Sequence, residues 1–326
     1  MANDLFVELQ EKLEGKKVRI VFPEAYDERV LEAAVKLSAT SYVQPVLVGK
    51  KEKVEELAQP LFLNVSGIEF VDHENYEKYD EMVAKFVERR AGKVTEEKAR
   101  ELLQDVNYFG TMLVYMGEVE GLVSGAIHST GDTVRPALQI IKTKPGVSRT
   151  SGAFIMSRNA SRFIFADCAI NTSIDAQGLA EIAVESAKTA KAFNINPKVA
   201  MLSFSTYGSA KTEETLKVAE ATRLVREKAP TLPVGGEMQF DAAYVPPVAK
   251  LKAPNSEIQG DANVFVFPSL EAGNIGYKIA QRLGGFEAVG PILQGLNAPV
   301  NDLSRGCNAE DVYKLALITA VQSLEK

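Results

Sequence analysis

The sequence predicts an α/β fold with largely parallel strands. Short β-branched or apolar runs alternate along the chain with small, hydroxylated loops and with helical patterns. This alternation is typical of strand–helix–strand units, and ligands bind in the loops at the carboxyl ends of such strands. The chain has 326 residues, more than one hydrophobic core usually holds, so two domains are expected.

The first expected strand, residues 18–22, is followed by small and acidic residues and then by apolar residues at helical spacing. Further strands are expected at 46–48, 68–71, 122–126, 163–166, 199–204 and 264–267. A Pro-Gly pair at 145–146 cannot continue the helix before it, and a second break lies near Gly290-Pro291. We therefore expect a discontinuous first α/β domain, residues 1–145 plus 291–326, and a second α/β domain, residues 146–290.

Composition excludes several classes of protein. The chain is 46% hydrophobic and 25% charged, as in ordinary globular proteins. No apolar run approaches the roughly 20 residues of a membrane span, and the start has no basic segment of the signal-peptide kind, so a cytosolic location is expected. Two cysteines are too few for a disulfide framework or for a metal site with four thiolate ligands. Two histidines are likewise too few for a His-rich metal site. A net charge of −6 argues against nonspecific nucleic-acid binding.

The loop before the final expected helix holds several reactive groups. Asn308 and Asp311 have the spacing of a helix-capping pair, which is a purely structural role. Ser304 and Arg305, one turn upstream, favour instead a site for phosphate or a developing oxyanion. From the residues alone the two interpretations are equally supported. The pKa of the Cys307 thiol is expected to be lowered by the helix start and by Arg305.

Two further loops have the form of anion sites, because each follows an expected strand and precedes a helix. Their hydroxyl and basic groups are Ser129, Thr130 and Arg135, and Ser205 and Thr206. The alternative for the first loop is an ordinary helix cap with Arg135 in solvent. His128 could act as an acid or base, although a lone histidine at a strand end is more often structural. The usual motifs of nucleotide hydrolysis and of dinucleotide binding are missing.

These residues resemble the phosphate acetyltransferase (phosphotransacetylase) family over nearly the whole chain. The matching segments are 23–25 with Arg29, 107–112, 128–139, 202–210, 236–239, 241–243, 263–276 and 297–311. The resemblance implies a two-lobed fold like that of isocitrate and isopropylmalate dehydrogenases, with the active site in the interdomain cleft. It also implies acetyl transfer between acetyl phosphate and coenzyme A, a role in acetate metabolism, a homodimer, no tightly bound cofactor and no metal.

The same resemblance assigns roles to individual residues. Asp311 would take the thiol proton of coenzyme A, Ser304 would orient that thiol, and Arg305 would stabilise charge at the acetyl carbonyl. Arg135 would hold the phosphate. The remaining substrate-binding residues would be Arg29, Arg282, Arg89 (with Arg90 as its alternative), Ser129, Thr130, Ser205 and Thr206. The expected partners are the small-molecule substrates coenzyme A, acetyl phosphate and phosphate, with no nucleic acid and no membrane.

Two other functions compete with this interpretation. A phosphate butyryltransferase would differ mainly in its acyl pocket. A noncatalytic module that binds acetyl-CoA, like the related domains fused to malic enzymes, is a second alternative. The presence of Ser304, Arg305 and Asp311 together disfavours the noncatalytic module.

Overall fold

The computed structural model describes residues 5–325. Residues 1–4 and 326 lie outside the described residues. The expectation that the N-terminus is not a signal peptide rests partly on residues 1–4. The described chain forms two compact units. Residues 5–144 and 296–325 form one, here named the terminal unit, and Pro145–Gly295 form the other, the central unit.

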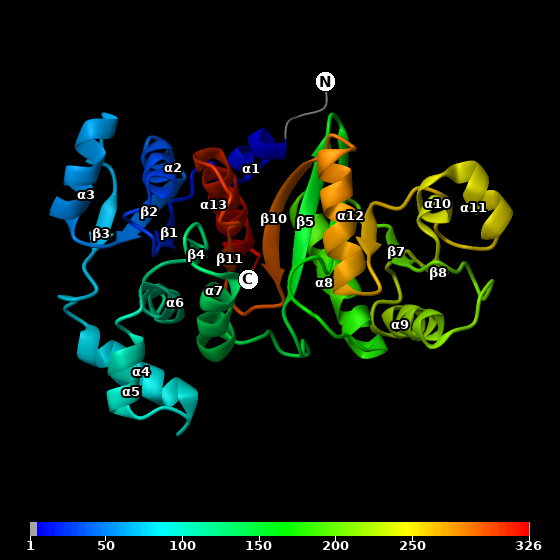
Figure 1. Ribbon diagram of the computed structural model, residues 1–326, viewed down its shortest axis with the longest axis horizontal. Coiled ribbons are helices and arrows are strands. Elements are labelled where there is room, and N and C mark those ends of the chain that lie inside the picture. The colour runs from blue at the N-terminus through cyan, green and yellow to red at the C-terminus, as the bar shows by residue number, and fades with distance from the viewer. Residues whose placement is uncertain (1–4, 326) are drawn as a thin grey trace. The chain divides into compact units, whose positions relative to one another are not determined.

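The terminal unit contains a five-stranded parallel sheet in the order β11–β4–β1–β2–β3 (Figure 1). Every residue of β4 and nearly every residue of β1 is buried, because helices cover both faces of a parallel sheet. The strands are β1 (Val18–Phe22), β2 (Val43–Val48), β3 (Glu69–Val71), β4 (Gly121–Ser124) and β11 (Val300–Asp302).

Helices pack on both faces of this sheet. α2 and α13 contact each other, while α6 and α7 pack together on the opposite side, as Figure 1 shows. α2 begins where the Asp27 carboxylate accepts backbone N–H bonds, and it buries Leu31 and Leu37. The helices are α1 (Leu5–Leu13), α2 (Glu28–Ser38), α3 (Lys51–Ala58), η1 (Gln59–Leu61), α4 (Tyr79–Arg90), α5 (Glu96–Leu102), α6 (Val106–Tyr115), α7 (Thr130–Pro136), η2 (Ala137–Ile141) and α13 (Ala309–Ser323).

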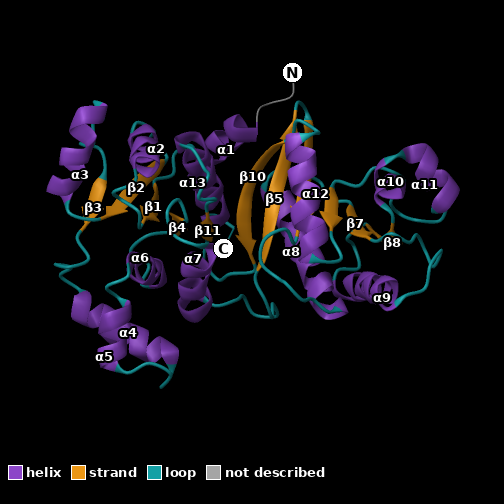
Figure 2. Cartoon of the chain, viewed as in Figure 1, coloured by secondary structure: helices purple, strands orange, loops and turns teal. Residues whose placement is uncertain are grey.

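The central unit contains a six-stranded mixed sheet in the order β10–β5–β6–β9–β7–β8 (Figure 2). Its first three strands are antiparallel neighbours, and β6, β9, β7 and β8 run parallel. α8 and α9 pack together on this sheet, and α12 contacts β10, β5 and β6. The elements are β5 (Ser151–Arg158), β6 (Ser161–Ala166), α8 (Ala176–Ala192), β7 (Val199–Leu202), α9 (Glu213–Lys228), β8 (Val234–Met238), α10 (Phe240–Tyr244), α11 (Pro246–Lys252), β9 (Val264–Val266), α12 (Leu270–Arg282) and β10 (Glu287–Gln294).

The α/β class with mostly parallel sheets is confirmed, and each expected strand overlaps an observed one. Four strands, β5, β8, β10 and β11, have no counterpart in the sequence-based expectation. Gly290-Pro291, where the sequence indicates a break, lies inside β10 as an irregularity: the register to β5 shifts between Val289 and Ile292. A proline donates no ladder hydrogen bond, and a bulge accommodates it within the strand.

Candidate active site

Three loops of the terminal unit lie side by side at the carboxyl edge of its sheet. They follow β1, β4 and β11, and β4 lies between the other two strands. All three loops lead into helices, namely α2, α7 and α13. Ligands of parallel α/β sheets bind at this edge, and most of the functional residues expected from the sequence lie here. We call these loops the candidate active site.

A buried carboxylate organises the loop after β4. Glu24, two residues after the end of β1, is almost fully buried. Its Oε2 accepts the backbone N–H groups of Gly125 (3.1 Å) and Ala126 (2.8 Å), and its Oε1 accepts those of Ile127 (2.9 Å) and His128 (3.0 Å). The His128 ring also meets Oε1, through Nδ1 at 2.8 Å. Charge-assisted bonds of this kind fix the loop before any substrate arrives.

Arg29 ties the three loops together. Its Nε and Nη2 donate to the two carboxylate oxygens of Asp27, at 3.0 and 2.8 Å. Its remaining N–H groups donate to the carbonyl oxygens of Arg305 (2.9 Å), Cys307 (3.0 Å) and Ala126 (2.8 Å). A guanidinium has five N–H donors, and all five are used. Burial would raise the pKa of Asp27, but the hydrogen bonds and charge of Arg29 lower it.

The turn between β11 and α13 leaves three expected catalytic groups exposed. Asn308 and Asp311 form a reciprocal capping box. The backbone N–H of Asn308 donates to Asp311 Oδ2 at 3.0 Å, and the backbone N–H of Asp311 donates to Asn308 Oδ1 at 2.9 Å. The box uses only one carboxylate oxygen of Asp311, so capping leaves Oδ1 available for proton transfer. Ser304 Oγ accepts the Gly306 amide at 3.3 Å, and the Arg305 side chain has no hydrogen bond or ion pair with any described residue.

α7 carries a second guanidinium, that of Arg135, that is unpaired within the described residues. Ser129 and Asp132 form a capping box: the Ser129 backbone N–H donates to Asp132 Oδ2 at 3.2 Å, and the Asp132 backbone N–H donates to Ser129 Oγ at 3.4 Å. Ser129 Oγ also donates to Asp132 Oδ2 at 2.6 Å. A Cβ at Gly131 would lie 4.0 Å from Arg135 Nη2, so the guanidinium lies against the first turn of the helix. Arg135 is exposed, as is Thr130, and within residues 5–325 its side chain has no polar partner. Ser129 and Asp132 therefore fit the capping interpretation of this loop, whereas Arg135 fits the anion-binding interpretation.

Cys307 corrects one expectation. The sequence predicts a lowered thiol pKa, but burial raises the pKa of Cys307 to about 11, and the nearby Arg29 opposes this only in part. The neutral thiol is therefore the dominant form near pH 7. Desolvation outweighs the helix start and the cation because Cys307 is buried, a property that its position in the sequence does not reveal.

Arg89 and Arg90 cap the carboxyl end of η2. Arg89 donates through Nε to the carbonyl oxygen of Ile140 (2.6 Å) and through Nη2 to that of Ile141 (2.8 Å). Arg90 Nη1 donates to the carbonyl oxygen of Gln139 at 3.2 Å. Cations are favourable at a helix carboxyl end, so these contacts are sufficient to explain both residues structurally.

The central unit carries the other expected residues. Ser205 and Thr206 are buried, and their hydroxyl groups donate to Glu237 Oε1 (2.9 Å) and Gln239 Oε1 (3.3 Å). These hydroxyl groups hold their own loop against the end of β8. Arg282, in the last turn of α12, is exposed and has no hydrogen bond or ion pair with the part of the chain that the structure describes.

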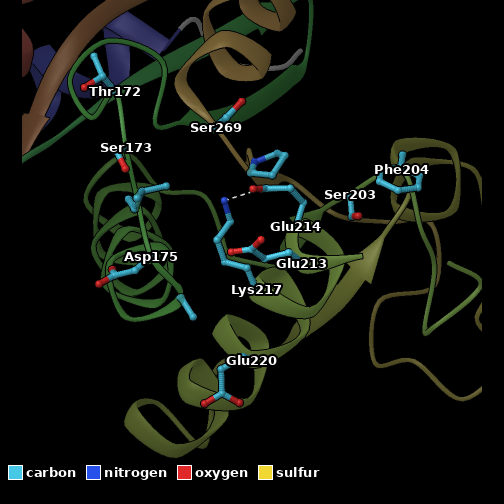
Figure 3. A pocket seen from close by; sticks show the side chains of 13 residues that line it. Thr172, Ser173, Asp175, Ser203, Phe204, Glu213, Glu214, Lys217, Glu220 and Ser269 are labelled. Carbon is cyan, nitrogen blue, oxygen red and sulfur yellow. Dashed lines mark ion pairs between the residues drawn. The ribbon is translucent and has the colours of Figure 1, made fainter. Parts of the chain in front are cut away.

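A pocket of about 920 Å³ lies in the central unit at the carboxyl ends of β6, β7 and β9 (Figure 3). Four of the five charged residues that line it are acidic, and the fifth, Lys217, pairs with Glu214 at 2.5 Å. Such a lining repels phosphate, and the free guanidinium groups of the terminal unit form the better anion site. The acidic lining groups are Asp175, Glu213, Glu214 and Glu220. Within residues 5–325 no helix is long and apolar enough to cross a membrane, and no three His, Cys, Asp or Glu side chains gather as a metal site.

Residues 4–320 match the model of the family described as phosphate acetyl/butaryl transferase. The chain belongs to this family. It is an acyltransferase family, and the sequence-based family assignment is confirmed. The chain is 65% identical to the phosphate acetyltransferase of Bacillus subtilis (strain 168), over 98% of this chain and 99% of that protein.

Two solved structures have the same fold and similar sequences. The EutD phosphotransacetylase from Staphylococcus aureus is 64% identical, with a TM-score of 0.94 and coverage of 98% of both chains. A phosphotransacetylase from Streptococcus pyogenes is 57% identical, with a TM-score of 0.96 and coverage of 99% of this chain and 98% of that one. A putative 4-hydroxythreonine-4-phosphate dehydrogenase from Salmonella typhimurium, 15% identical with a TM-score of 0.56, shares the fold and confirms its likeness to dehydrogenases.

Proposed function

We propose that the protein is a cytosolic phosphate acetyltransferase that interconverts acetyl-CoA plus phosphate and coenzyme A plus acetyl phosphate. One observation carries the proposal: the exposed guanidinium groups of Arg135 and Arg305, which have no polar partner among residues 5–325, follow neighbouring parallel strands, β4 and β11, and the exposed carboxylate of Asp311 follows Arg305 at the start of α13. Two cations suit a phosphorylated substrate, and a carboxylate suits removal of a thiol proton. The names of the similar proteins support acetyl as the acyl group.

In the proposed mechanism both substrates are bound together and the thiol attacks directly. Asp311 Oδ1 takes the proton of the coenzyme A thiol, and the resulting thiolate forms a bond to the acetyl carbonyl carbon of acetyl phosphate. The carbonyl oxygen becomes an oxyanion beside Arg305, and the bond between the acetyl carbon and the phosphate oxygen then breaks. The carbonyl re-forms as the bonding electron pair leaves with the phosphate, which Arg135 holds. The thiol proton then passes from Asp311 to this phosphate, which departs as hydrogen phosphate and regenerates the carboxylate. The products are acetyl-CoA and inorganic phosphate.

The pKa of the coenzyme A thiol determines how much rate acceleration Asp311 must supply as a base. A thiol near pKa 8.5 is mostly protonated at neutral pH, and a positioned base typically contributes roughly 10²–10⁴-fold. Arg305, as one charged donor at a developing oxyanion, contributes about 3 kcal/mol, or roughly another 10²-fold. Ser304 is exposed one residue before Arg305, where its hydroxyl can orient the incoming thiol. Thr130 is an exposed residue in the first turn of α7, the helix that carries Arg135.

Other expected substrate residues take different parts in this proposal. Arg29 acts through the loops that it ties together, because its five donors are already used. Ser129, Arg89, Ser205 and Thr206 support local structure by the contacts described above. Arg282 remains a candidate for a phosphate of coenzyme A, because its guanidinium is exposed and unpaired among the described residues.

A homodimer is part of the proposal, and α12 supplies its surface. Ile275, Ile279 and Leu283 lie four residues apart on one helix face and are 57%, 53% and 85% exposed. Apolar stripes of this kind on a helix are normally buried. A second copy of the chain, presenting the same stripe about a twofold axis, would bury both.

Thioester formation from acetyl phosphate and coenzyme A tests the function directly. The purified protein should form acetyl-CoA in the absence of added nucleotide, and initial rates over both substrates should give intersecting double-reciprocal lines, as a ternary complex requires. Parallel lines would indicate an acyl-enzyme instead. Turnover of butyryl phosphate at least as fast as that of acetyl phosphate would replace the acetyltransferase assignment by the butyryltransferase alternative.

A further inference from the structure

A buried carboxyl group lies behind the candidate active site and has no part in the mechanism above. Asp302 ends β11, two residues before Ser304, and is only 1% exposed. It lies opposite Ser124 of β4 in the parallel register. Gly125 has a φ of +109°, and a Cβ there would lie 2.4 Å from Asp302 Oδ1. The carboxyl group is therefore packed tightly against the loop that leads into α7.

The first turn of α7 covers the other side of this carboxyl group. α7 packs on β11, and the hydroxyl groups of Thr130 and Thr133 face Asp302. Asp302 Oδ1 and Thr133 Oγ1 are both buried and have no hydrogen-bond partner within the described chain. Buried polar atoms are rarely left unpaired in folded proteins. Small shifts of α7 would let these hydroxyl groups donate to the carboxylate, so Asp302 is placed to control where α7 begins.

The electrostatic surroundings make this group titrate near neutral pH. The pKa of Asp302 is raised to about 6; burial is the largest cause, and the negative charge of Glu24 acts in the same direction. The two threonine hydroxyl groups favour the ionised form and oppose this shift. The other charged or titratable groups on the elements around Asp302 are His128 in the loop after β4, Asp132 and Arg135 on α7, Arg305 and Cys307 in the turn after β11, and Glu310, Asp311, Tyr313 and Lys314 on α13.

We propose that Asp302 is a positioning residue for the acetyl transfer proposed above, on which this inference rests. In its ionised form the carboxylate accepts hydrogen bonds from Thr130 and Thr133 and fixes the start of α7, which carries Arg135. Protonation removes an acceptor, so the first turn of α7 loosens and Arg135 holds the phosphate less well. Asp302 touches no substrate, and its effect reaches the reaction through α7.

The pH dependence of kcat/KM for acetyl phosphate, measured on the full chain from pH 5 to 8, tests this role. In the parent protein kcat/KM should fall about tenfold per pH unit below about pH 6. Asp302→Asn cannot ionise, so it should lack this acid limb and show a lower, flat profile. Glu185→Gln removes another largely buried carboxylate, one paired with Lys188 in the central unit, and should keep the limb. His128→Asn should also keep it.

An acid limb that persists in Asp302→Asn would overturn the proposal. So would a limb that disappears in His128→Asn, because His128 would then be the titrating group. A parent protein that forms no thioester contradicts the proposed function itself. An active parent whose limb is unaffected by Asp302→Asn contradicts only the role of Asp302.

Thermal stability gives a second measurement that needs no activity. The folded state binds the Asp302 proton more tightly than the unfolded state does, so the resulting stability is complete below about pH 3.9 and is lost as pH rises through about 6. Asparagine mimics the protonated form at every pH. The Tm of Asp302→Asn relative to the parent should therefore rise by a few degrees between pH 4.5 and 7.5, and a constant difference would contradict the inference.

Discussion

At the scale of single residues, the arginines of this chain divide by how many of their donors the protein already uses. Arg29 spends all five N–H groups on Asp27 and on backbone carbonyl oxygens, and Arg89 caps a helix end. Arg135 and Arg305 have no polar side-chain contact among residues 5–325. A sequence shows all four as equal cations. The difference depends on which carbonyl oxygens the fold brings near each guanidinium, and only the tertiary structure shows this.

Arg135→Ala and Arg305→Ala should each lower kcat/KM for acetyl phosphate by roughly 10²-fold or more, because each removes a charge-assisted contact to the reacting groups. Their Tm should stay within about 1 °C of the parent, because neither side chain supports the fold. Arg223→Ala, which removes an exposed arginine paired with Glu220 and Glu227 on α9, is the matched control and should keep parental kinetics. Near-parental kcat/KM in both test variants would remove these residues from the site.

Asp311 combines two functions that mutation can separate. Asp311→Asn should lower kcat by roughly 10²-fold with little change in KM, because the proton acceptor is lost while binding groups remain. Raising the pH should partly rescue it, since free thiolate becomes abundant. Asn308→Ala breaks the same capping box but leaves the carboxylate, so it should cost about 1 kcal/mol of stability and much less kcat. Equal kinetic losses in the two variants would reduce Asp311 to a helix cap.

Cys307 should be dispensable for catalysis. Coenzyme A supplies the thiol nucleophile, and burial holds the Cys307 pKa near 11, so little thiolate exists at pH 7. Cys307→Ala should retain most of the parental kcat. Alkylation of Cys307 by iodoacetamide, followed by mass spectrometry, should be slow at pH 7 and accelerate steadily up to pH 10. An acetyl group trapped on Cys307 during turnover would contradict this and would favour an acyl-enzyme.

At the scale of elements, buried carboxylates set the loops that follow parallel strands. Glu24 binds four consecutive amide N–H groups, and in the central unit Asp167 accepts the amide N–H groups of four residues around it. Asp167 directly follows β6 and Glu24 lies two residues after β1, and the sequence shows both positions. The amides that they bind are fixed only by tertiary structure. Glu24 entered the sequence-based reasoning only through a family resemblance, and its role as an anchor was missed for this reason.

The expected and missed strands differ in a physical way. β9 is a short, continuous apolar run and β1 is apolar except for Arg19, because both strands are largely buried, and such runs are visible in a sequence. β11 has only three residues, two of them polar, and β10 contains a Gly-Pro pair that indicates a break. Their hydrogen-bonded neighbours, rather than their own composition, make them strands. The sequence therefore predicts the buried apolar strands of the two sheets, but it does not predict strands such as β10 and β11, whose residues are partly polar or include a Gly-Pro pair.

Arg29→Lys separates its structural role from direct substrate binding. Lysine keeps the charge but cannot reproduce the contacts with Asp27 and with three carbonyl oxygens in two other loops. If Arg29 acts through those loops, kcat should fall about tenfold or more, Tm should fall by several degrees, and the KM for acetyl phosphate should change little. A variant with parental Tm and a selectively raised KM would show instead that Arg29 binds substrate.

At the scale of the whole molecule, the apolar face of α12 is the feature that a single chain leaves unexplained. Among the residues of this helix only Gly273 is buried, against the backbone of Asp167, where a Cβ would lie 2.2 Å from the carbonyl oxygen. Close backbone approach on that side keeps the helix firmly on the central unit. Its exposed isoleucines and leucine on another side are therefore fixed in place as a surface, and the periodic pattern in the sequence cannot show that they remain uncovered.

Ile279→Asp should convert the proposed homodimer into a monomer, because a charge at the centre of an apolar stripe cannot be buried unpaired. Sedimentation equilibrium should give about twice the 35.5 kDa chain mass for the parent and one chain mass for the variant. Lys278→Asp, the adjacent position on a different side of the same helix, controls for the added charge and should remain dimeric. If the parent sediments as a monomer at micromolar concentration, α12 does not pair two copies of this chain.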